Sequence, residues 1–269
     1  MSLFIKMAYI LNDPTIFDIQ LNPYDVYNLS ADIDCLVIRW ATSRGIESTN
    51  FMRVAASIGD VQCLQYLHNN GILWNWTTCR AAALNGNLDA LIYLHEEGCP
   101  WNETTCWKAA GNGHLDCLRY AHEHGCPWDE EICYMAAFHG QLEILKYLHE
   151  EGCPWNEETC RIAAGNGRLP ILRYAHENGC PWNEWTCYEA ASNGHLDCLI
   201  YAHEHGCPWD ASTCYEAAFN GHLDCLTYAI ENNCPWQDRL CVFARRHNDI
   251  LDYLRGKGLC REASTYLCT

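Results

Sequence analysis

Apolar and polar residues along most of the chain recur in one pattern, with a step of 27 residues. Each copy holds two short segments whose apolar residues are spaced three and four positions apart, which predicts two short helices. In one copy the first segment places Cys106, Ala109 and Ala110 on one helix face. The second segment places Leu118 and Ala121 on a common stripe. Helices this short cannot bury their own apolar faces, so neighbouring pairs are expected to stack.

Polar and turn-forming residues mark where each helix should begin and end. Asn102 precedes the first helix as an N-cap, and Glu103 suits the positive end of the helix dipole. The Asn112–Gly113 pair ends that helix, after which a second helix starts. Gly125 ends the second helix as a left-handed C-cap, and Pro127 cannot continue it. The copy is therefore expected to be a helix-turn-helix unit.

The repeat frame divides the chain into three parts. Seven tryptophans share one slot: Trp74, Trp101, Trp128, Trp155, Trp182, Trp209 and Trp236. Residues 1–44 fall out of register and are predicted to form a divergent N-terminal cap, residues 45–233 are predicted repeats, and residues 234–269 form the last repeat and a C-terminal cap. The expected fold is an all-α solenoid of stacked helix-turn-helix repeats.

The stretch from Thr105 to Gly125 resembles the ankyrin repeat, through its Ala-Ala pair, its Asn-Gly-His-Leu turn and its closing glycine. The unit is shorter than the roughly 33 residues of an ankyrin repeat, so full β-hairpin fingers are not expected. Copies with a Gly-Cys-Pro-Trp signature are similar to short repeats in large DNA viruses of amoebae and in some protists. The resemblance implies a protein-binding scaffold without catalysis.

Composition narrows the range of partners and compartments. The chain has 34 acidic and 17 basic residues, for a formal charge of −17, which argues against nucleic acid as a partner. No apolar stretch approaches the roughly 18 to 20 residues of a membrane-spanning helix, and the first eleven residues lack a signal-peptide cleavage site. We therefore expect a soluble, cytoplasmic protein, in the host cytoplasm or the virion if the source is a virus.

The 20 cysteines are the first candidates for chemistry, and most of them fall into three repeat slots. Divergent copies replace them with Met52, Ile72, Ala90, Ile144 and Ile171, which are apolar and cannot bind metal in their place. Free cysteine behaves as a small buried hydrophobe, so core filling is favoured over zinc or heme binding. Disulfides within one slot are excluded if successive copies lie about 8 to 10 Å apart. No cofactor and no metal are expected.

Histidines also form a column, close to the C-terminal end of each second helix: His68, His95, His122, His149, His176 and His203. Interaction with the last carbonyls of the helix is favoured there, and a pH-responsive ladder is the alternative. A second column, His114, His195 and His222, lies in the turn. No catalytic set occurs at a unique position, so no catalytic residue is predicted.

Slots that vary between copies are free to recognise a partner. The slot after the Ala-Ala pair faces the concave binding surface in the ankyrin family, so the resemblance implies that Leu84, Phe138 and Phe219 contact a partner. Aromatic side chains, which often anchor protein interfaces, also occur beside the first-helix cysteine and at the start of the first helix. These further candidates are Trp107, Tyr134, Tyr188, Tyr215, Trp76 and Trp185. For the slot beside the cysteine, packing between repeats is an equal alternative.

The function expected from these features is the binding of an unknown protein, with a basic segment of that partner attracted to the acidic surface. A monomer is expected for such a module. An assembly protein, for example a virion component that makes lattice contacts, is the alternative. Residues 21–40 also faintly resemble the start of an F-box, which would make the chain a ubiquitin-ligase adaptor.

Overall fold

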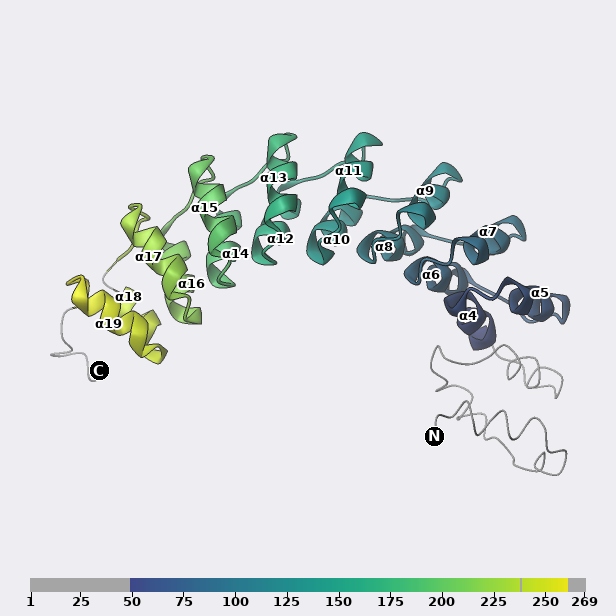
Figure 1. The fold of residues 1–269 in the computed structure, drawn as a ribbon, viewed down its shortest axis with the longest axis horizontal. Coiled ribbons are helices and arrows are strands. Elements are labelled where there is room, and N and C mark those ends of the chain that lie inside the picture. Colours follow the sequence, from purple (N-terminus) through teal and green to yellow (C-terminus); the bar gives the residue numbers. More distant parts are fainter. Residues whose placement is uncertain (1–48, 238, 261–269) are drawn as a thin grey trace, which may run out of the picture. The chain divides into compact units, whose positions relative to one another are not determined.

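The computed structural model describes residues 49–237 and 239–260, and all elements in these ranges are helical (Figure 1). The chain divides into two compact units, residues 1–128 and residues 129–269. The predicted cap of residues 1–44, with its F-box-like stretch, lies outside the described residues. The predicted domain limits at residues 44 and 233 stay predictions.

In the first unit, the residues that the structure describes form three helical pairs. They are α4 (Thr49–Ile58) with α5 (Val61–Asn69), α6 (Trp76–Leu84) with α7 (Leu88–Glu96), and α8 (Glu103–Gly111) with α9 (Leu115–Glu123). The first helices α4, α6 and α8 pack against one another in chain order.

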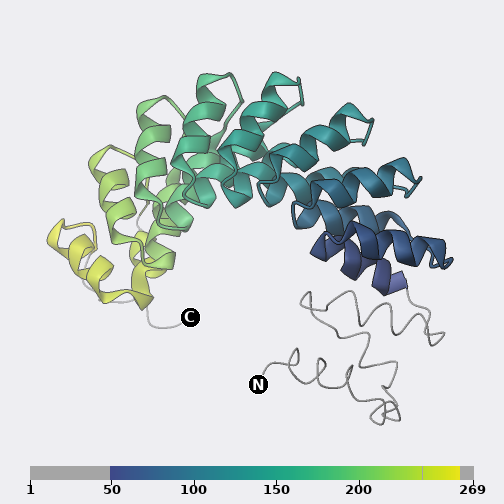
Figure 2. The ribbon, with the colours of Figure 1, turned by 45° about the vertical axis from the view of Figure 1, so that its right-hand side comes forward.

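The described residues of the second unit form four complete pairs, followed by a divergent one. The pairs are α10 (Glu131–His139) with α11 (Leu142–Glu150), α12 (Glu157–Gly165) with α13 (Leu169–Glu177), α14 (Glu184–Ser192) with α15 (Leu196–Glu204), and α16 (Ala211–Asn220) with α17 (Leu223–Glu231). The last comprises α18 (Leu240–Phe243), a 3-10 turn η2 (Ala244–Arg246) and α19 (Asn248–Gly256). Figure 2 shows the first helices of this unit in one row and the second helices in another. The all-α repeat fold is confirmed.

The helix ends are set by the residues predicted to set them. The Asn102 side chain accepts a hydrogen bond from the backbone N–H of Thr104 at 3.2 Å, which satisfies a free donor of the first turn. Gly113 adopts a φ of +80° in the turn between the two helices, and Gly125 adopts +81° after the second. Both predicted helices of this copy are confirmed.

Small residues of the first helices and leucines of the second helices form the core. Ala109, Ala110, Leu118 and Ala121 are fully buried. The fifteen free cysteines of the described part are also buried, which confirms their predicted place in the core. A disulfide between Cys241 and Cys260, which the repeat pattern did not predict, joins α18 to the segment after α19.

The histidine column links successive repeats through aromatic contacts. The His95 ring stacks on Trp101 with ring centroids 4.0 Å apart, and its Nδ1 lies 3.0 Å from the Tyr120 hydroxyl of the next second helix. In the second unit His203 makes the same contacts with Trp209 and Tyr228, at 3.9 and 2.9 Å. The histidine side chains therefore join neighbouring repeats, whereas the sequence favoured contacts with helix carbonyls.

A pH dependence follows from one of these histidines, His176, whose ring stacks on Trp182 at 3.7 Å. Burial lowers the pKa of His176, the nearby His205 lowers it further, and Glu177 opposes the shift. The folded state thus favours the neutral ring, so this contribution to stability is complete above the unfolded-state pKa of about 6.5 and is lost as the pH falls below it. When the pH is lowered from 7.5 to 5.5, we expect the free energy of unfolding to decrease more in the wild type than in His176→Phe.

Urea unfolding of both proteins at the two pH values tests this expectation. Phenylalanine keeps a ring against Trp182 but cannot be protonated. The general effect of acid on a chain of net charge −17 cancels in the comparison. An equal response of the two proteins would show that His176 does not respond to pH in this way.

The turn column makes a second contact between repeats. His222 Nε2 donates a hydrogen bond to the Ser192 carbonyl at 3.1 Å, and His114 Nε2 makes the same bond to Leu84. The His222 ring lies directly over Gly194, where an added Cβ would lie 2.5 Å from Nδ1. In the last repeat the second helix arrives two residues early, and His247 occupies the equivalent place, 3.0 Å from the Phe219 carbonyl. The turn histidines therefore fix the register of the stack.

Candidate functional site

The largest exposed apolar side chains lie mainly on the first helices. Most of them were singled out from the sequence. Their exposed fractions are 37% for Leu84, 46% for Phe138, 45% for Phe219, 40% for Trp76 and 50% for Trp185. Each belongs to the outer stripe of its helix, which repeats every three or four residues. This stripe is the candidate binding surface of each unit.

In the first unit the stripe runs along α6. Trp76, Arg80 and Leu84 are spaced four residues apart, and the Arg80 guanidinium lies 5.5 Å from the centre of the Trp76 ring. This cation–π contact holds Arg80 over the ring and leaves Leu84 open at the end of the helix. Trp107, the equivalent of Arg80 on α8, is half-buried.

In the second unit the stripe begins on α10 with Tyr134 and Phe138. Tyr134 is half-buried, and its pKa is raised by burial first and then by Glu131, which accepts a hydrogen bond from its hydroxyl. Phe138, one turn further on, contacts the neighbouring His139 ring with centroids 5.0 Å apart. Phe138 is therefore the more accessible of the two rings.

The same division recurs on α14. Trp185 lies in the first turn and contacts the Tyr188 ring edge-on at 5.0 Å. Burial raises the pKa of Tyr188, and Glu216 on α16 raises it further by its charge and by accepting the tyrosine hydrogen bond. Tyr188 thus reaches the next first helix, whereas Trp185 is exposed.

The last members of the stripe contact the divergent final repeat. Tyr215 stacks on Phe243 with ring centroids 4.8 Å apart. The Arg246 guanidinium lies 5.9 Å from the centre of the Phe219 ring, which is still almost half exposed. In the second unit, the rings of Tyr188 and Tyr215 thus pack between repeats, whereas Phe138, Trp185 and Phe219 remain exposed, and Phe219 contacts the last repeat through Arg246.

Two carboxylates are held in place within this part of the stripe. Glu189 forms an ion pair with Arg161, and its Oε2 accepts a hydrogen bond from Asn193 at 3.3 Å. Glu216 Oε2 accepts hydrogen bonds from Ser192 at 3.3 Å and from Asn220 at 3.2 Å. Across the described ranges of the chain, no cationic side chain forms an ion pair with Glu216. Glu216 is therefore oriented by neutral donors while its charge is not balanced by a partner cation.

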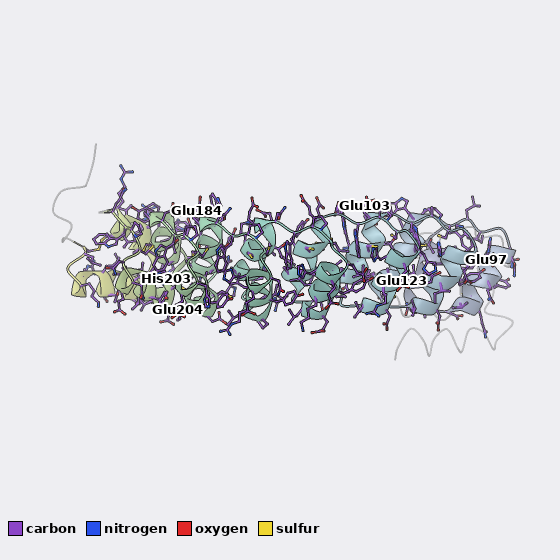
Figure 3. All side chains as sticks on the ribbon, turned by 90° about the horizontal axis from the view of Figure 1, so that it is seen from above. Glu97, Glu103, Glu123, Glu184, His203 and Glu204 are labelled. Atoms are coloured by element: carbon purple, nitrogen blue, oxygen red, sulfur yellow. A yellow bond between two sulfur atoms is a disulfide. The ribbon has the colours of Figure 1, made fainter. Side chains whose placement is uncertain are left out.

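Acidic side chains also occur away from the stripe. Glu184 lies in the first turn of α14 and Glu204 in the last turn of α15, and both are exposed. Figure 3 shows them at separate places on the surface of the second unit, with His203 beside Glu204. The negative charge is thus spread over the unit and is not confined to the stripe.

Three exposed apolar residues were not predicted as binding residues. Leu73 is 76% exposed and Val242 is 60% exposed, with Ile58 at 38%. Leu73 stands where most copies have the proline of Gly-Cys-Pro-Trp, and Val242 stands beside the first-helix cysteine of the last copy. A comparison of the copies could have found Leu73 and Val242, because each differs in type from the residue that most copies have in that slot.

In the described part of the chain, no three side chains of His, Cys, Asp or Glu come together in a way that could hold a metal ion. No described helix is long and apolar enough to cross a membrane.

Comparison with known proteins relates part of the repeat array to a protein family. Residues 79–159 match the family model for ankyrin repeats, in three copies. A comparison with curated proteins found no match. Ankyrin repeats generally mediate protein–protein interaction, and proteins built from them are typically non-enzymatic interaction modules. The described part of the chain is therefore a series of helix-turn-helix repeats, of which residues 79–159 are similar to ankyrin repeats.

Proposed function

We propose that the chain binds another protein through the exposed stripe of its first helices, and that the partner presents a basic segment. The observation that carries the proposal is the arrangement in the second unit. There the exposed rings of Phe138, Trp185 and Phe219 share one stripe with Glu216, whose carboxylate is oriented but has no partner cation.

Exposed rings on a rigid helix favour binding because few degrees of freedom are lost when they are covered. Aromatic side chains bury a large area and have few rotatable bonds, which is why they dominate the binding energy of many interfaces. The backbone beneath Phe219 is fixed, since its carbonyl accepts the His247 hydrogen bond. A partner would therefore meet a preformed surface.

The charge of the surface favours a basic partner. A lysine or arginine placed beside Glu216 would gain a charge-assisted hydrogen bond without first breaking an ion pair. The net charge of −17 would also speed the approach of a cationic partner at low ionic strength. Charge complementarity of this kind increases the specificity and the association rate more than the affinity.

We expect the double variant Phe138→Ala/Phe219→Ala to lose at least about 30-fold in affinity for its partner, since interface aromatics often contribute more than about 1 kcal/mol each and about 1.4 kcal/mol is a factor of ten. Peptides selected on the full wild-type chain from a displayed random library would serve as the probe. Isothermal titration of those peptides with each variant measures the loss. Leu84→Ala, on the first unit, is tested separately.

Leu73→Ala is the matched control, because Leu73 is the most exposed of these apolar residues but lies in a connecting segment outside the stripe. It should leave the affinity unchanged, and Glu216→Gln should weaken the peptides that contain lysine or arginine. Equal binding by the wild type and the double variant would contradict the proposal. If purified wild-type protein instead forms regular oligomers that the double variant does not, the assembly function is favoured.

A further inference from the structure

Buried cysteines occur in contacting pairs within single repeats. One member lies in the first helix, and the other follows the second helix, 20 residues later. Five of them are Cys79 with Cys99, Cys133 with Cys153, Cys160 with Cys180, Cys187 with Cys207, and Cys214 with Cys234. Cys106 and Cys126 occupy the same two slots. The Cys79 thiol lies 3.8 Å from the backbone carbonyl of its partner Cys99.

The second member of each pair is also tied to the backbone of the preceding loop. The Cys180 thiol donates to the Asn156 carbonyl at 3.2 Å, and the Cys207 thiol donates to Asn183 at the same distance. Cys153 lies somewhat further from its acceptor, the Asp129 carbonyl, at 3.6 Å. These bonds hold the second sulfur beside the first helix of its own repeat.

The last repeat already contains a covalent bond in this region. The Cys241–Cys260 disulfide joins the first helix to the segment after the second helix, with Cα atoms 6.0 Å apart. That separation lies within the usual range for disulfides. The slot of the second cysteine is occupied there by Leu259, and Cys260 follows it directly. The last repeat therefore shows that a first-helix cysteine can be bonded to the segment after the second helix.

We propose that the five cysteine pairs are sites of reversible disulfide formation, and that their reaction partner is a low-molecular-weight disulfide of the glutathione type. This inference is independent of the proposed binding function.

The reaction balances as a thiol–disulfide exchange. The second thiol of the pair loses its proton and attacks one sulfur of the small disulfide, which forms a mixed disulfide and releases one small thiol. The first-helix thiol then loses its proton and attacks the protein sulfur of the mixed disulfide, which releases the second small thiol. The two protein thiols are oxidised and the small disulfide is reduced to two thiols.

Accessibility assigns the two roles. Cys133 in the first helix is fully buried, whereas Cys153 retains 4% exposure, and Cys160 and Cys180 differ in the same direction. The hydrogen bond from Cys133 also lowers the pKa of Cys153, while burial and the same bond raise the pKa of Cys133. The thiolate is the attacking form, so Cys153 should react first.

The experiment treats the full reduced chain with glutathione disulfide under native conditions, blocks the remaining thiols and digests the protein without reduction. Mass spectrometry should find disulfides within the five pairs, with Cys133–Cys153 formed earliest. Cys117 is the internal control, because burial and Asp116 raise its pKa to about 11 and it has no place in a pair; it should be blocked as a free thiol. Disulfides scattered among unpaired slots, or no oxidation without denaturant, would overturn the proposal.

Two variants separate the roles within one pair. In Cys133→Ala, Cys153 should stop at the mixed disulfide and retain glutathione. In Cys153→Ile, Cys133 should stay a thiol, and isoleucine is compatible with the slot because Ile72 occupies it in an earlier copy. Recovery of Cys133 as a glutathione adduct in the second variant would reverse the assignment and refute the mechanism.

Unfolding provides a second readout that does not depend on digestion. Each new bond closes a loop between two parts of one repeat and restricts the unfolded chain. The oxidised wild type should unfold at a higher urea concentration than the reduced form, and dithiothreitol should reverse the shift. Identical midpoints for the two forms would contradict an effect of these bonds on the repeats.

Discussion

Replacing Leu172 with alanine is expected to lower the free energy of unfolding by about 2–5 kcal/mol, the range seen when a large buried aliphatic side chain is truncated. Leu172 lies on α13, is fully buried and belongs to the leucine column of the second helices. Short helices depend on packing for their stability, so the cavity left here weakens the contact that holds α13 against its own repeat.

Urea unfolding of the full chain measures this loss. Val242→Ala is the matched control, because it also shortens an aliphatic side chain of the second unit but at a position that is 60% exposed. It should change stability by less than about 0.5 kcal/mol. A loss for Leu172→Ala as small as that of the control would mean that the leucine column does not stabilise the stack.

Replacing Gly194 with alanine is expected to destabilise the protein through two separate effects. Its φ of +75° disfavours any residue with a Cβ, at a cost of about 1–2 kcal/mol. The new Cβ would also lie 2.5 Å from the His222 ring, which adds about 1–3 kcal/mol of steric strain or displaces the ring. A displaced His222 would lose its bond to the Ser192 carbonyl.

A second glycine separates the two effects. Gly206 has a φ of +84°, but a Cβ placed there meets nothing within 4 Å. Gly206→Ala should therefore show the backbone cost alone, and Gly194→Ala should cost more. In a His222→Ala background the two substitutions should cost about the same. If they already cost the same with His222 present, the histidine does not press on the glycine.

Much of the fold could be predicted from the sequence because its signals are local and repeated. An N-cap such as Asn102, a turn such as Asn112–Gly113 and the spacing of Leu118 and Ala121 each depend on neighbours within a few residues. The repetition of each signal in successive copies then separates the structural slots from the variable ones.

The contacts between repeats could not be predicted in this way. His95 lies in a slot where the helix dipole favours a cation, which suggested the wrong contact. Its stacking on Trp101 and its bond to Tyr120 depend on how the next repeat is placed. The spacing of Cys241 and Cys260 likewise differs from that of the thiol pairs, because the last second helix begins two residues early and Cys260 lies one residue beyond the slot of the second cysteine.

The candidate binding surface could be predicted from the sequence only in part. The variable slots pointed to Phe138 and Phe219, which are exposed, but pattern alone could not decide whether Tyr188 and Tyr215 face solvent or a neighbouring helix. That choice depends on Glu216 and Phe243 in the following repeats, which supply a hydrogen bond and a ring.

The constant step between copies also bears on how such a gene can change length. Each histidine contacts a tryptophan and a tyrosine at a fixed distance along the chain, as His203 contacts Trp209 and Tyr228. Loss of residues 156–182 would bring Asn183 directly after Trp155, and Tyr201 would take the place of Tyr174 beside His149. Unequal crossing-over between copies therefore yields longer or shorter arrays whose joints are chemically the same, and selection can act on array length without first repairing the fold.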